Sequence, residues 1–238
     1  MGKINSIETM GALDGPGIRV IVYFQGCPLR CVYCHNPDTW HVAGGTDISA
    51  SEIVKKAERY KPYFSDKGGI TFSGGEPLLQ PQFLIDCLKE SKEKGIHTAL
   101  DTSGIGIGRY EEILNYTDLV ILDIKHEDSD MYEKITGVKI EEYYKFKEAI
   151  IKKNQKVWLK HVVVPGWTDD EKHIEELKRE VYSFNNIEKV ELLPYHTMGV
   201  HKYKDLGIQY QLADIEDMNI VKIKELQKMI LECNLISE

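Results

Sequence analysis

Three cysteines lie close together near the start of the chain, at Cys27, Cys31 and Cys34, in the spacing C-x3-C-x2-C. They directly follow residues 18–24, where nearly every position is apolar, as is typical of a strand buried on both faces. Thiolates this close in sequence cannot all face solvent or all pack in a core, so a loop must wrap them around one centre. A soft metal is the natural occupant of such a centre. We therefore predict a metal-binding loop over about residues 26–40.

The number of available ligands separates zinc from iron–sulfur at this loop. Structural zinc sites use four ligands, usually as two pairs far apart in sequence. A second pair is missing here, because Cys87 and Cys233 each stand alone within helical patterns and are expected to pack as small apolar side chains. His35 adjoins Cys34, and adjacent ligands fit a tetrahedral site poorly. A cubane iron–sulfur cluster on three cysteines instead leaves one iron open to a substrate.

Composition and charge narrow the class of protein. The chain has 238 residues, of which 42% are apolar, which suits one sizeable core, and no apolar run is long enough to span a bilayer. The N-terminus lacks the basic region and apolar stretch of a signal peptide, so we expect a cytoplasmic protein whose five cysteines stay reduced. The net charge of −8 argues against nucleic acid as the main partner, and no membrane is expected as a partner either.

Strand and helix patterns alternate along the rest of the chain. Strands are predicted at 18–24, 69–72, 97–100, 119–122, 157–164 and 190–193. Helices are predicted from the capping box at Ser49 to about 60, from about 83 to Gly95, and over about 109–115, 141–153, 169–184 and 214–233. About six β–α units imply a parallel sheet with right-handed crossovers. We expect a single α/β domain over residues 1–238, because no linker or shift in composition divides the chain.

Polar side chains follow several of these strands. Gly74-Gly75-Glu76, Asp101-Thr102, Asp123-Ile124-Lys125 and His196 all stand at predicted strand ends. In parallel sheets and barrels the chemistry gathers where the carboxyl ends of the strands meet. Paired glycines let main-chain carbonyls approach a bound ammonium group closely. Singly, each segment also fits a plain turn, a helix cap or a histidine near the rim, so the shared location is what favours a site.

The three-cysteine spacing, with the aromatic Tyr33 before the last cysteine, resembles the signature of the radical S-adenosylmethionine superfamily. The resemblance implies a partial (β/α)6 TIM-like barrel and a [4Fe-4S] cluster on Cys27, Cys31 and Cys34, with the amine and carboxylate of S-adenosylmethionine on the fourth iron. It implies cofactor contacts at Tyr33, His35, Gly74, Gly75, Glu76, Asp123, Lys125 and His196. It also implies a monovalent cation held by Asp101, Thr102 and Asp123.

Four further stretches, at 14–19, 34–40, 157–167 and 191–196, narrow the resemblance. They are similar to the activases of glycyl radical enzymes, in particular those that act on pyruvate formate-lyase, and the likeness runs over nearly the whole chain. Lys160 is a departure, because Arg is expected there and the preference for a peptide substrate could differ. No cysteine lies between Cys34 and Cys87, so we expect a single cluster and no ferredoxin-like insertion.

The resemblance also implies a reaction and its partners. Flavodoxin or ferredoxin supplies one electron to the cluster, whose low potential depends on burial, charge and hydrogen bonds. Cleavage of S-adenosylmethionine then gives methionine and a 5′-deoxyadenosyl radical or an iron-bound equivalent, which takes a Cα hydrogen from a glycine of pyruvate formate-lyase. We expect an oxidoreductase of anaerobic metabolism that acts as a monomer. The cofactors carry the chemistry, while the protein supplies geometry and exclusion.

Three alternatives stay open from the sequence. A plain iron–sulfur electron carrier does not need the Gly-Gly-Glu turn or the acids at the strand ends, and it leaves S-adenosylmethionine intact. A zinc-stabilised binding module is colourless, whereas a [4Fe-4S] protein purified without oxygen is brown. An activase of another glycyl radical enzyme differs only in its protein substrate.

Overall fold

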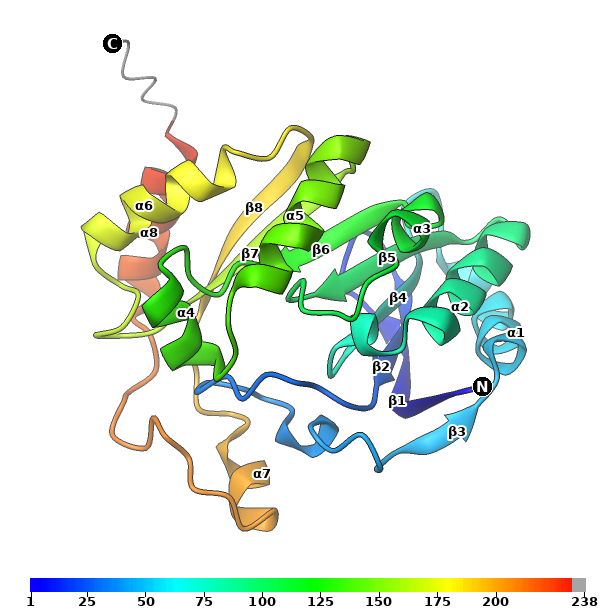
Figure 1. The fold of residues 1–238 in the computed structure, drawn as a ribbon, viewed down its shortest axis with the longest axis horizontal. Helices are drawn as coiled ribbons and strands as arrows, with labels where there is room; N and C mark the ends of the chain where they lie inside the picture. Colours follow the sequence, from blue (N-terminus) through cyan, green and yellow to red (C-terminus); the bar gives the residue numbers. More distant parts are fainter. Residues whose placement is uncertain (233–238) are drawn as a thin grey trace.

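The computed structural model describes residues 1–232, and its centre is one eight-stranded sheet (Figure 1). The strands run in the order β3-β1-β2-β4-β5-β6-β7-β8. Their bounds are β1 Gly2–Gly11, β2 Arg19–Phe24, β3 Thr46–Ile48, β4 Gly69–Gly74, β5 His97–Thr102, β6 Leu119–Asp123, β7 Val157–Val163 and β8 Ile187–Pro194. From β2 to β8 all neighbours pair in parallel, whereas β1 is antiparallel to β2 and β3. Within the described residues β3 and β8 do not pair, so the barrel stays open.

Eight α-helices connect or flank the strands of the described chain. They are α1 Ala50–Tyr60, α2 Pro81–Glu93, α3 Tyr110–Asn115, α4 Ser129–Thr136, α5 Glu141–Lys153, α6 Glu171–Val181, α7 Val200–Asp205 and α8 Ile220–Leu231. Three short 3-10 turns lie at Pro37–Thr39, Lys61–Tyr63 and Pro77–Leu79. Helices α6 and α8 pack on each other beside β8, and α1 packs on α2 near the other edge of the sheet (Figure 1). None of the described helices has both the length and the apolar character needed to cross a membrane.

Local sequence sets the ends of these helices. Helix α1 begins at a capping box in which the Glu52 backbone N–H donates to Ser49 Oγ (3.2 Å) and the Ser49 N–H donates to Glu52 Oε2 (2.9 Å). Asp128 and Asp170 cap α4 and α6 in the same way, with side-chain oxygens that accept backbone N–H groups. Gly137 ends α4 with a φ of 73°, a left-handed conformation that glycine adopts without steric cost. Each crossover is therefore delimited by its own polar residues.

The bottom of the barrel, at the amino ends of its strands, holds a buried cation. Arg19 at the start of β2 is 0% exposed, and its guanidinium donates to Thr71 Oγ1 (2.6 Å) and to the Ile70 carbonyl (2.7 Å) of β4. Further N–H groups donate to the carbonyls of Pro16 and Lys67. Burial lowers the pKa of Arg19 to about 10, which still leaves it charged at neutral pH. The stretch 14–19 thus lies at the amino ends of the strands, away from their carboxyl ends.

The fold class predicted from the sequence is confirmed, and all six predicted strands are present. Strands β1 and β3 and helices α4 and α7 were not predicted. In β1 only Ile4 and Gly11 are buried and two register shifts interrupt the pairing with β2, so the alternation of apolar side chains is weak. The last helix begins at Ile220 and not near 214, because Asn219 caps it with its side-chain oxygen. Cys233 lies outside the described residues.

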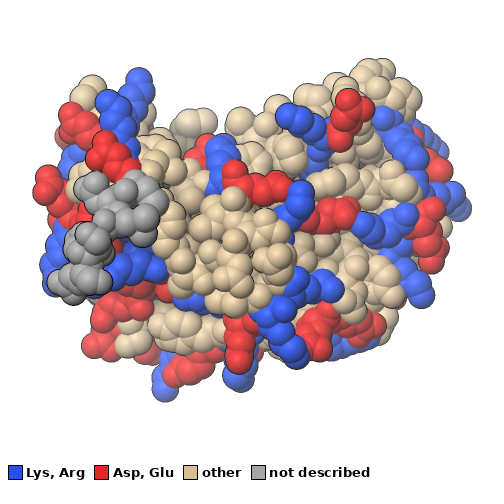
Figure 2. All heavy atoms as spheres, turned by 90° about the horizontal axis from the view of Figure 1, so that it is seen from above, with Lys and Arg blue, Asp and Glu red and all other residues tan. Residues whose placement is uncertain are grey.

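Surface charges of both signs lie side by side. Figure 2 shows Lys and Arg interspersed with Asp and Glu on the face it presents, around a central area of other residues. No extended single-sign patch stands out on that face. This distribution agrees with the solvated surface expected from 30 basic and 38 acidic residues.

Candidate functional site

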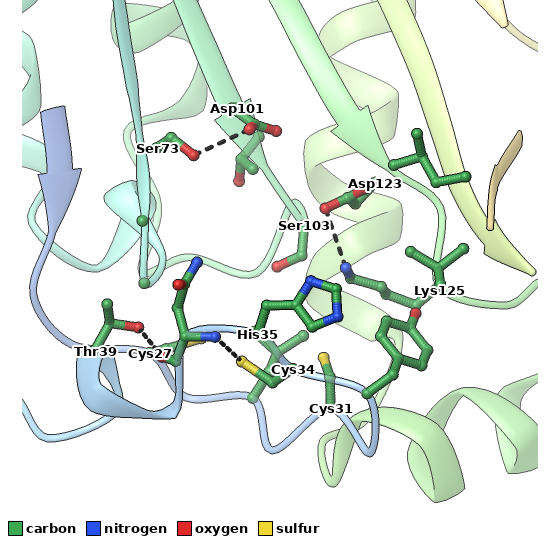
Figure 3. Close-up of a pocket in the computed structure, with 18 of the residues that line it drawn as sticks. Cys27, Cys31, Cys34, His35, Thr39, Ser73, Asp101, Ser103, Asp123 and Lys125 are labelled. Atoms are coloured by element: carbon green, nitrogen blue, oxygen red, sulfur yellow. Dashed lines mark hydrogen bonds and ion pairs between the residues drawn. The ribbon is translucent and has the colours of Figure 1, made fainter. Parts of the chain in front are cut away.

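A cavity of about 380 Å³ lies where the cysteine loop meets the carboxyl ends of the strands (Figure 3). The predicted site residues that line it are Cys27, Cys31, Tyr33, Cys34, His35, Gly74, Gly75, Asp101, Thr102, Asp123, Lys125 and His196. Other lining residues are Leu29, Asn36, Thr39, Ser73, Ser103, Val162, Leu193 and Pro194. Segments from β4 to β8 thus meet the loop at one place. Glu76 is the one predicted site residue that does not line this cavity.

The cysteine loop is held by hydrogen bonds within itself and to α4. The Gly26 N–H donates to the Thr39 carbonyl (2.7 Å), which closes the base of the loop. The Arg30 N–H donates to the carbonyl of Thr136 (2.6 Å), which ties the middle of the loop to α4. The Arg30 side chain also folds back onto the Cys27 carbonyl (2.8 Å). These bonds fix the shape of the loop, and the side chains of its three cysteines point toward a common space, as Figure 3 shows.

A segment that follows β8 covers the loop from the other side. Tyr203 donates its hydroxyl to the Cys34 carbonyl (2.9 Å), and Lys202 Nζ lies 3.1 Å from Asp38 Oδ1. His35 Nε2 lies 3.0 Å from the His196 carbonyl, so that nitrogen carries the proton and donates it. The two imidazoles stack with their centroids 4.2 Å apart. No local pattern indicates the roles of Lys202 and Tyr203, because they depend on contacts between residues far apart in the chain.

The chemistry of the cavity wall fits an iron–sulfur centre with a polar ligand. Burial raises the pKa of the Cys31 thiol to about 12 and also raises the pKa of Cys27 and Cys34, so the three thiols hold protons that a metal can displace. Tyr33 Oη and His196 Nδ1 are buried and have no hydrogen-bond partner among the described residues. Buried polar atoms are rarely left unpaired, so both are available to a bound molecule.

An ion pair stands at the end of β6. Lys125 Nζ lies 3.1 Å from Asp123 Oδ2 and 5.6 Å from the centre of the Tyr33 ring. Burial by itself lowers the pKa of Lys125, but the Asp123 carboxylate, Tyr33 and Cys31 outweigh it, and the pKa is raised well above its usual value. Lys125 is therefore a fixed positive charge beside the cysteines, suited to a carboxylate ligand.

Acids at the strand ends surround a second lysine. Asp101 accepts a hydrogen bond from Ser73 Oγ (3.0 Å), and burial raises its pKa to about 6, against the opposing effect of Lys160. Lys160 is 8% exposed, and although burial lowers its pKa, Asp101, Asp123 and Asp14 outweigh this and raise it. The ammonium of Lys160 thus already neutralises part of the charge that a monovalent cation on Asp101 and Asp123 would neutralise.

Glu76 is turned into the protein and organises the neighbouring strand end. Its side chain is buried, with Oε1 accepting from Thr102 Oγ1 (2.5 Å) and the Leu78 N–H (3.1 Å). Its Oε2 accepts from the N–H (2.9 Å) and the hydroxyl (2.5 Å) of Ser103. Glu76 therefore holds two cavity-lining residues, Thr102 and Ser103, in place. Its predicted direct contact with the cofactor is not supported by the position of its side chain, which points away from the cavity.

The two glycines are required by close approach of backbone to backbone. A Cβ on Gly74, which has a φ of 106°, would lie 2.5 Å from the Phe24 nitrogen. A Cβ on Gly75 would lie 2.3 Å from the Gly26 carbonyl oxygen. Both distances are shorter than real contacts allow, so a side chain on Gly74 would push the end of β4 away from β2, and one on Gly75 would push it away from the cysteine loop.

Comparison with known proteins agrees with this site. Residues 21–177 match the model of the radical SAM superfamily. The chain is 56% identical over 233 residues to the pyruvate formate-lyase-activating enzyme of Clostridium pasteurianum, covering 98% of each chain, and 44% identical to that of Staphylococcus epidermidis, covering 96% of this chain and 95% of the relative.

A solved structure of an activating enzyme is also similar to this chain. The crystal structure of a domain of pyruvate-formate lyase-activating enzyme from Bacteroides vulgatus superposes with a TM-score of 0.57 at 26% identity, covering 69% of this chain and 93% of that one. The family match covers most of the described sheet, including the cysteine loop and the strand ends up to β7. The chain therefore belongs to the radical SAM superfamily and, within it, to the family of the pyruvate formate-lyase-activating enzymes.

Proposed function

We propose that this chain activates pyruvate formate-lyase by generating a radical from S-adenosylmethionine and removing a Cα hydrogen from a glycine of that enzyme. The observation that supports it best is the shared cavity, in which Cys27, Cys31 and Cys34 face the charged end of β6. The relatives named above carry this activity in their names. An iron–sulfur electron carrier has no need for a cavity of this size beside its cysteines.

The cofactors are proposed to be a [4Fe-4S] cluster on the three cysteines and S-adenosylmethionine in the remaining space. When bound, the reduced cluster supplies the electron that splits the sulfonium of S-adenosylmethionine. The carbonyls near Gly74 and Gly75 are suited to accept hydrogen bonds from its amino group, because no side chain stands before them. Lys125 is suited to bind its carboxylate, and Tyr33, His35 and His196 offer rings and polar atoms for the adenosyl part.

The acids at the strand ends have a different role in this proposal. Asp101, Thr102 and Asp123 are proposed to hold a monovalent cation beside the cofactor carboxylate. The ammonium of Lys160 neutralises part of the charge of Asp101 and Asp123, so a cation there is bound more weakly than these two carboxylates alone would bind it. Glu76 does not contact the cation in this proposal. It supports the site by fixing Thr102 and Ser103 through hydrogen bonds.

The protein substrate is proposed to enter where the sheet remains open. Strands β3 and β8 are the two edges of the described sheet, and a loop carrying glycine can approach the cavity most closely because glycine has no side chain. We further propose that residues 1–238 form one domain with its cluster loop at about 26–40, that the chain works as a monomer, and that flavodoxin or ferredoxin is the electron donor.

Anaerobic activation tests the proposal. The cluster-loaded chain, a chemical reductant and S-adenosylmethionine are mixed with pyruvate formate-lyase, and the glycyl radical is measured by electron paramagnetic resonance. We expect a radical signal with the wild type and with Lys139→Gln, an exposed lysine, and a large loss with Lys125→Gln. Cleavage of S-adenosylmethionine without a glycyl radical would assign the chain to another glycyl radical enzyme, and intact S-adenosylmethionine would favour an electron carrier.

A further inference from the structure

A second group of metal-binding side chains lies outside the cavity. His126 and Glu127 follow β6, His161 lies on β7, and His173 lies in the first turn of α6. The three histidines are 6%, 2% and 4% exposed. Ligand atoms of His126, Glu127 and His173 lie within 4.8 Å of one another. Three imidazoles and a carboxylate are an unusual content for a buried position, where polar groups need partners.

The hydrogen bonds fix which ring nitrogens carry protons. His161 Nδ1 lies 2.8 Å from the Ile124 carbonyl, which can only accept, so His161 Nε2 presents a lone pair. That lone pair lies 3.1 Å from His173 Nε2, which must therefore be the donor. In its neutral form His173 then presents the lone pair of Nδ1, and this atom lies 3.1 Å from Glu127 Oε1. Two lone pairs face each other unless a cation lies between them.

His126 adds a further lone pair at the same place. Its Nδ1 accepts the backbone N–H of Asp128 (3.0 Å) and lies 3.7 Å from Glu127 Oε2. Glu127 Oε2 is buried and has no hydrogen-bond partner among the described residues. A proton on His173 satisfies Oε1 of this carboxylate but leaves Oε2 buried and unpaired, which is unfavourable. A metal ion that both imidazoles and the carboxylate share satisfies all of these atoms.

We propose that His126, Glu127 and His173 bind a divalent transition metal, with zinc as the best match. Zinc takes imidazole nitrogen and carboxylate oxygen at about 2.0–2.2 Å, which puts neighbouring ligand atoms of a tetrahedral site roughly 3.3–3.5 Å apart. His173 Nδ1 lies 3.1 Å from Oε1 and His126 Nδ1 lies 3.7 Å from Oε2, so the two imidazoles approach different oxygens of the carboxylate, each at a distance near that value. Binding replaces the bond from the Asp128 N–H, and because Asp128 is an exposed residue, this N–H can donate to water in its place.

His161 completes the arrangement as a positioning residue. A histidine that binds a metal usually donates its other ring N–H to an acceptor, which fixes the ring and makes it a better ligand. His173 does this through Nε2 to His161, and His161 is fixed in turn by the Ile124 carbonyl. Ile124 precedes Lys125, so the metal would tie α6 to the strand end that carries the cavity lysine.

Zinc binding to the cluster-loaded chain tests the proposal. The chain is dialysed anaerobically against zinc, and zinc, iron and sulfide per chain are measured by elemental analysis, with a chromophoric chelator as competitor for the dissociation constant. We expect one zinc per chain in the wild type and in His41→Gln, an exposed histidine. Glu127→Gln and His173→Gln should weaken the dissociation constant by at least about a hundredfold, and His161→Gln by about tenfold to a hundredfold.

Two further measurements keep the result unambiguous. A variant with Cys27→Ala, Cys31→Ala and Cys34→Ala should lose its iron and keep its zinc, which separates this site from the cysteines. Zinc should raise the melting temperature Tm of the wild type and leave that of folded Glu127→Gln unchanged. The proposal is overturned if the wild type binds no zinc, in which case His173 and Glu127 share a proton. It is also overturned if Glu127→Gln binds zinc as the wild type does, or if the variant without the three cysteines loses its zinc.

Discussion

Replacing Glu76 by glutamine tests whether this residue acts by supporting the cavity wall. The carboxylate accepts four hydrogen bonds, two on each oxygen, and each pair includes one backbone N–H and one hydroxyl. A glutamine keeps one oxygen and turns an NH2 group toward the other pair. The hydroxyl of that pair can rotate and accept, but the backbone N–H of Leu78 or Ser103 cannot. One buried N–H is therefore left without a partner, which costs about 1–3 kcal/mol.

Part of this loss is offset, because burial raises the pKa of Glu76 and a neutral glutamine avoids burying the charge. We therefore expect a net decrease at the lower end of that range, about 1 kcal/mol, in the free energy of unfolding, measured by urea titration of samples with equal iron content. Hydrogen exchange should be faster at Leu78 or Ser103. Glu93→Gln, at an exposed helix position, is the matched control. A change in Glu76→Gln no larger than that of the control, with both amides still protected, would refute the reasoning.

Three more changes have expected outcomes. Gly75→Ala should lower the iron content per chain, because its Cβ would lie 2.3 Å from the Gly26 carbonyl, whereas Gly166→Ala, with nothing within 4 Å of its Cβ, should not. The raised pKa of Asp101 means that the folded state keeps a proton between about pH 4 and 6, so the free energy of unfolding should fall by up to about 3 kcal/mol as pH rises through that window, and Asp101→Asn should abolish the fall. Arg19→Met should lower the free energy of unfolding by about 2–6 kcal/mol in urea titration, since two buried acceptors lose their donor, and a loss below 1 kcal/mol would contradict this.

The sequence predicted the parts of the fold that depend on local pattern. Apolar runs marked β2 and β6, because strands covered on both faces leave no alternation to misread, and shorter apolar stretches marked β4, β5, β7 and β8. The cysteine spacing and the polar residues after each strand predicted which side chains meet, since parallel strands bring their carboxyl ends to one edge. Strand β1 was not predicted, because its pairing with β2 is interrupted and most of its side chains are half-exposed, so no clear alternation marks it.

The parts of the site that could not be predicted depend on contacts between distant residues. Nothing in the Gly-Gly-Glu run indicates that Glu76 turns inward to Thr102 and Ser103, because its partners lie on another strand end. The histidine cluster likewise combines His126 and Glu127, which follow β6, with residues from β7 and α6, and only the packing of α6 on the sheet brings them together. The sequence shows that Lys160 departs from the family pattern. Only the fold shows that it lies close to Asp101, Asp123 and Asp14.

The cover that the segment after β8 places over the cysteine loop has a consequence for biosynthesis. Tyr203 bonds the Cys34 carbonyl across 169 residues of chain, so the ribosome completes the cysteines long before it makes their cover. During translation the three thiols therefore stand open on the nascent polypeptide, accessible to iron–sulfur carriers and equally to oxidants. Docking of the late segment then covers the loop at Cys34, so the final stage of synthesis reduces how far this part of the loop is exposed.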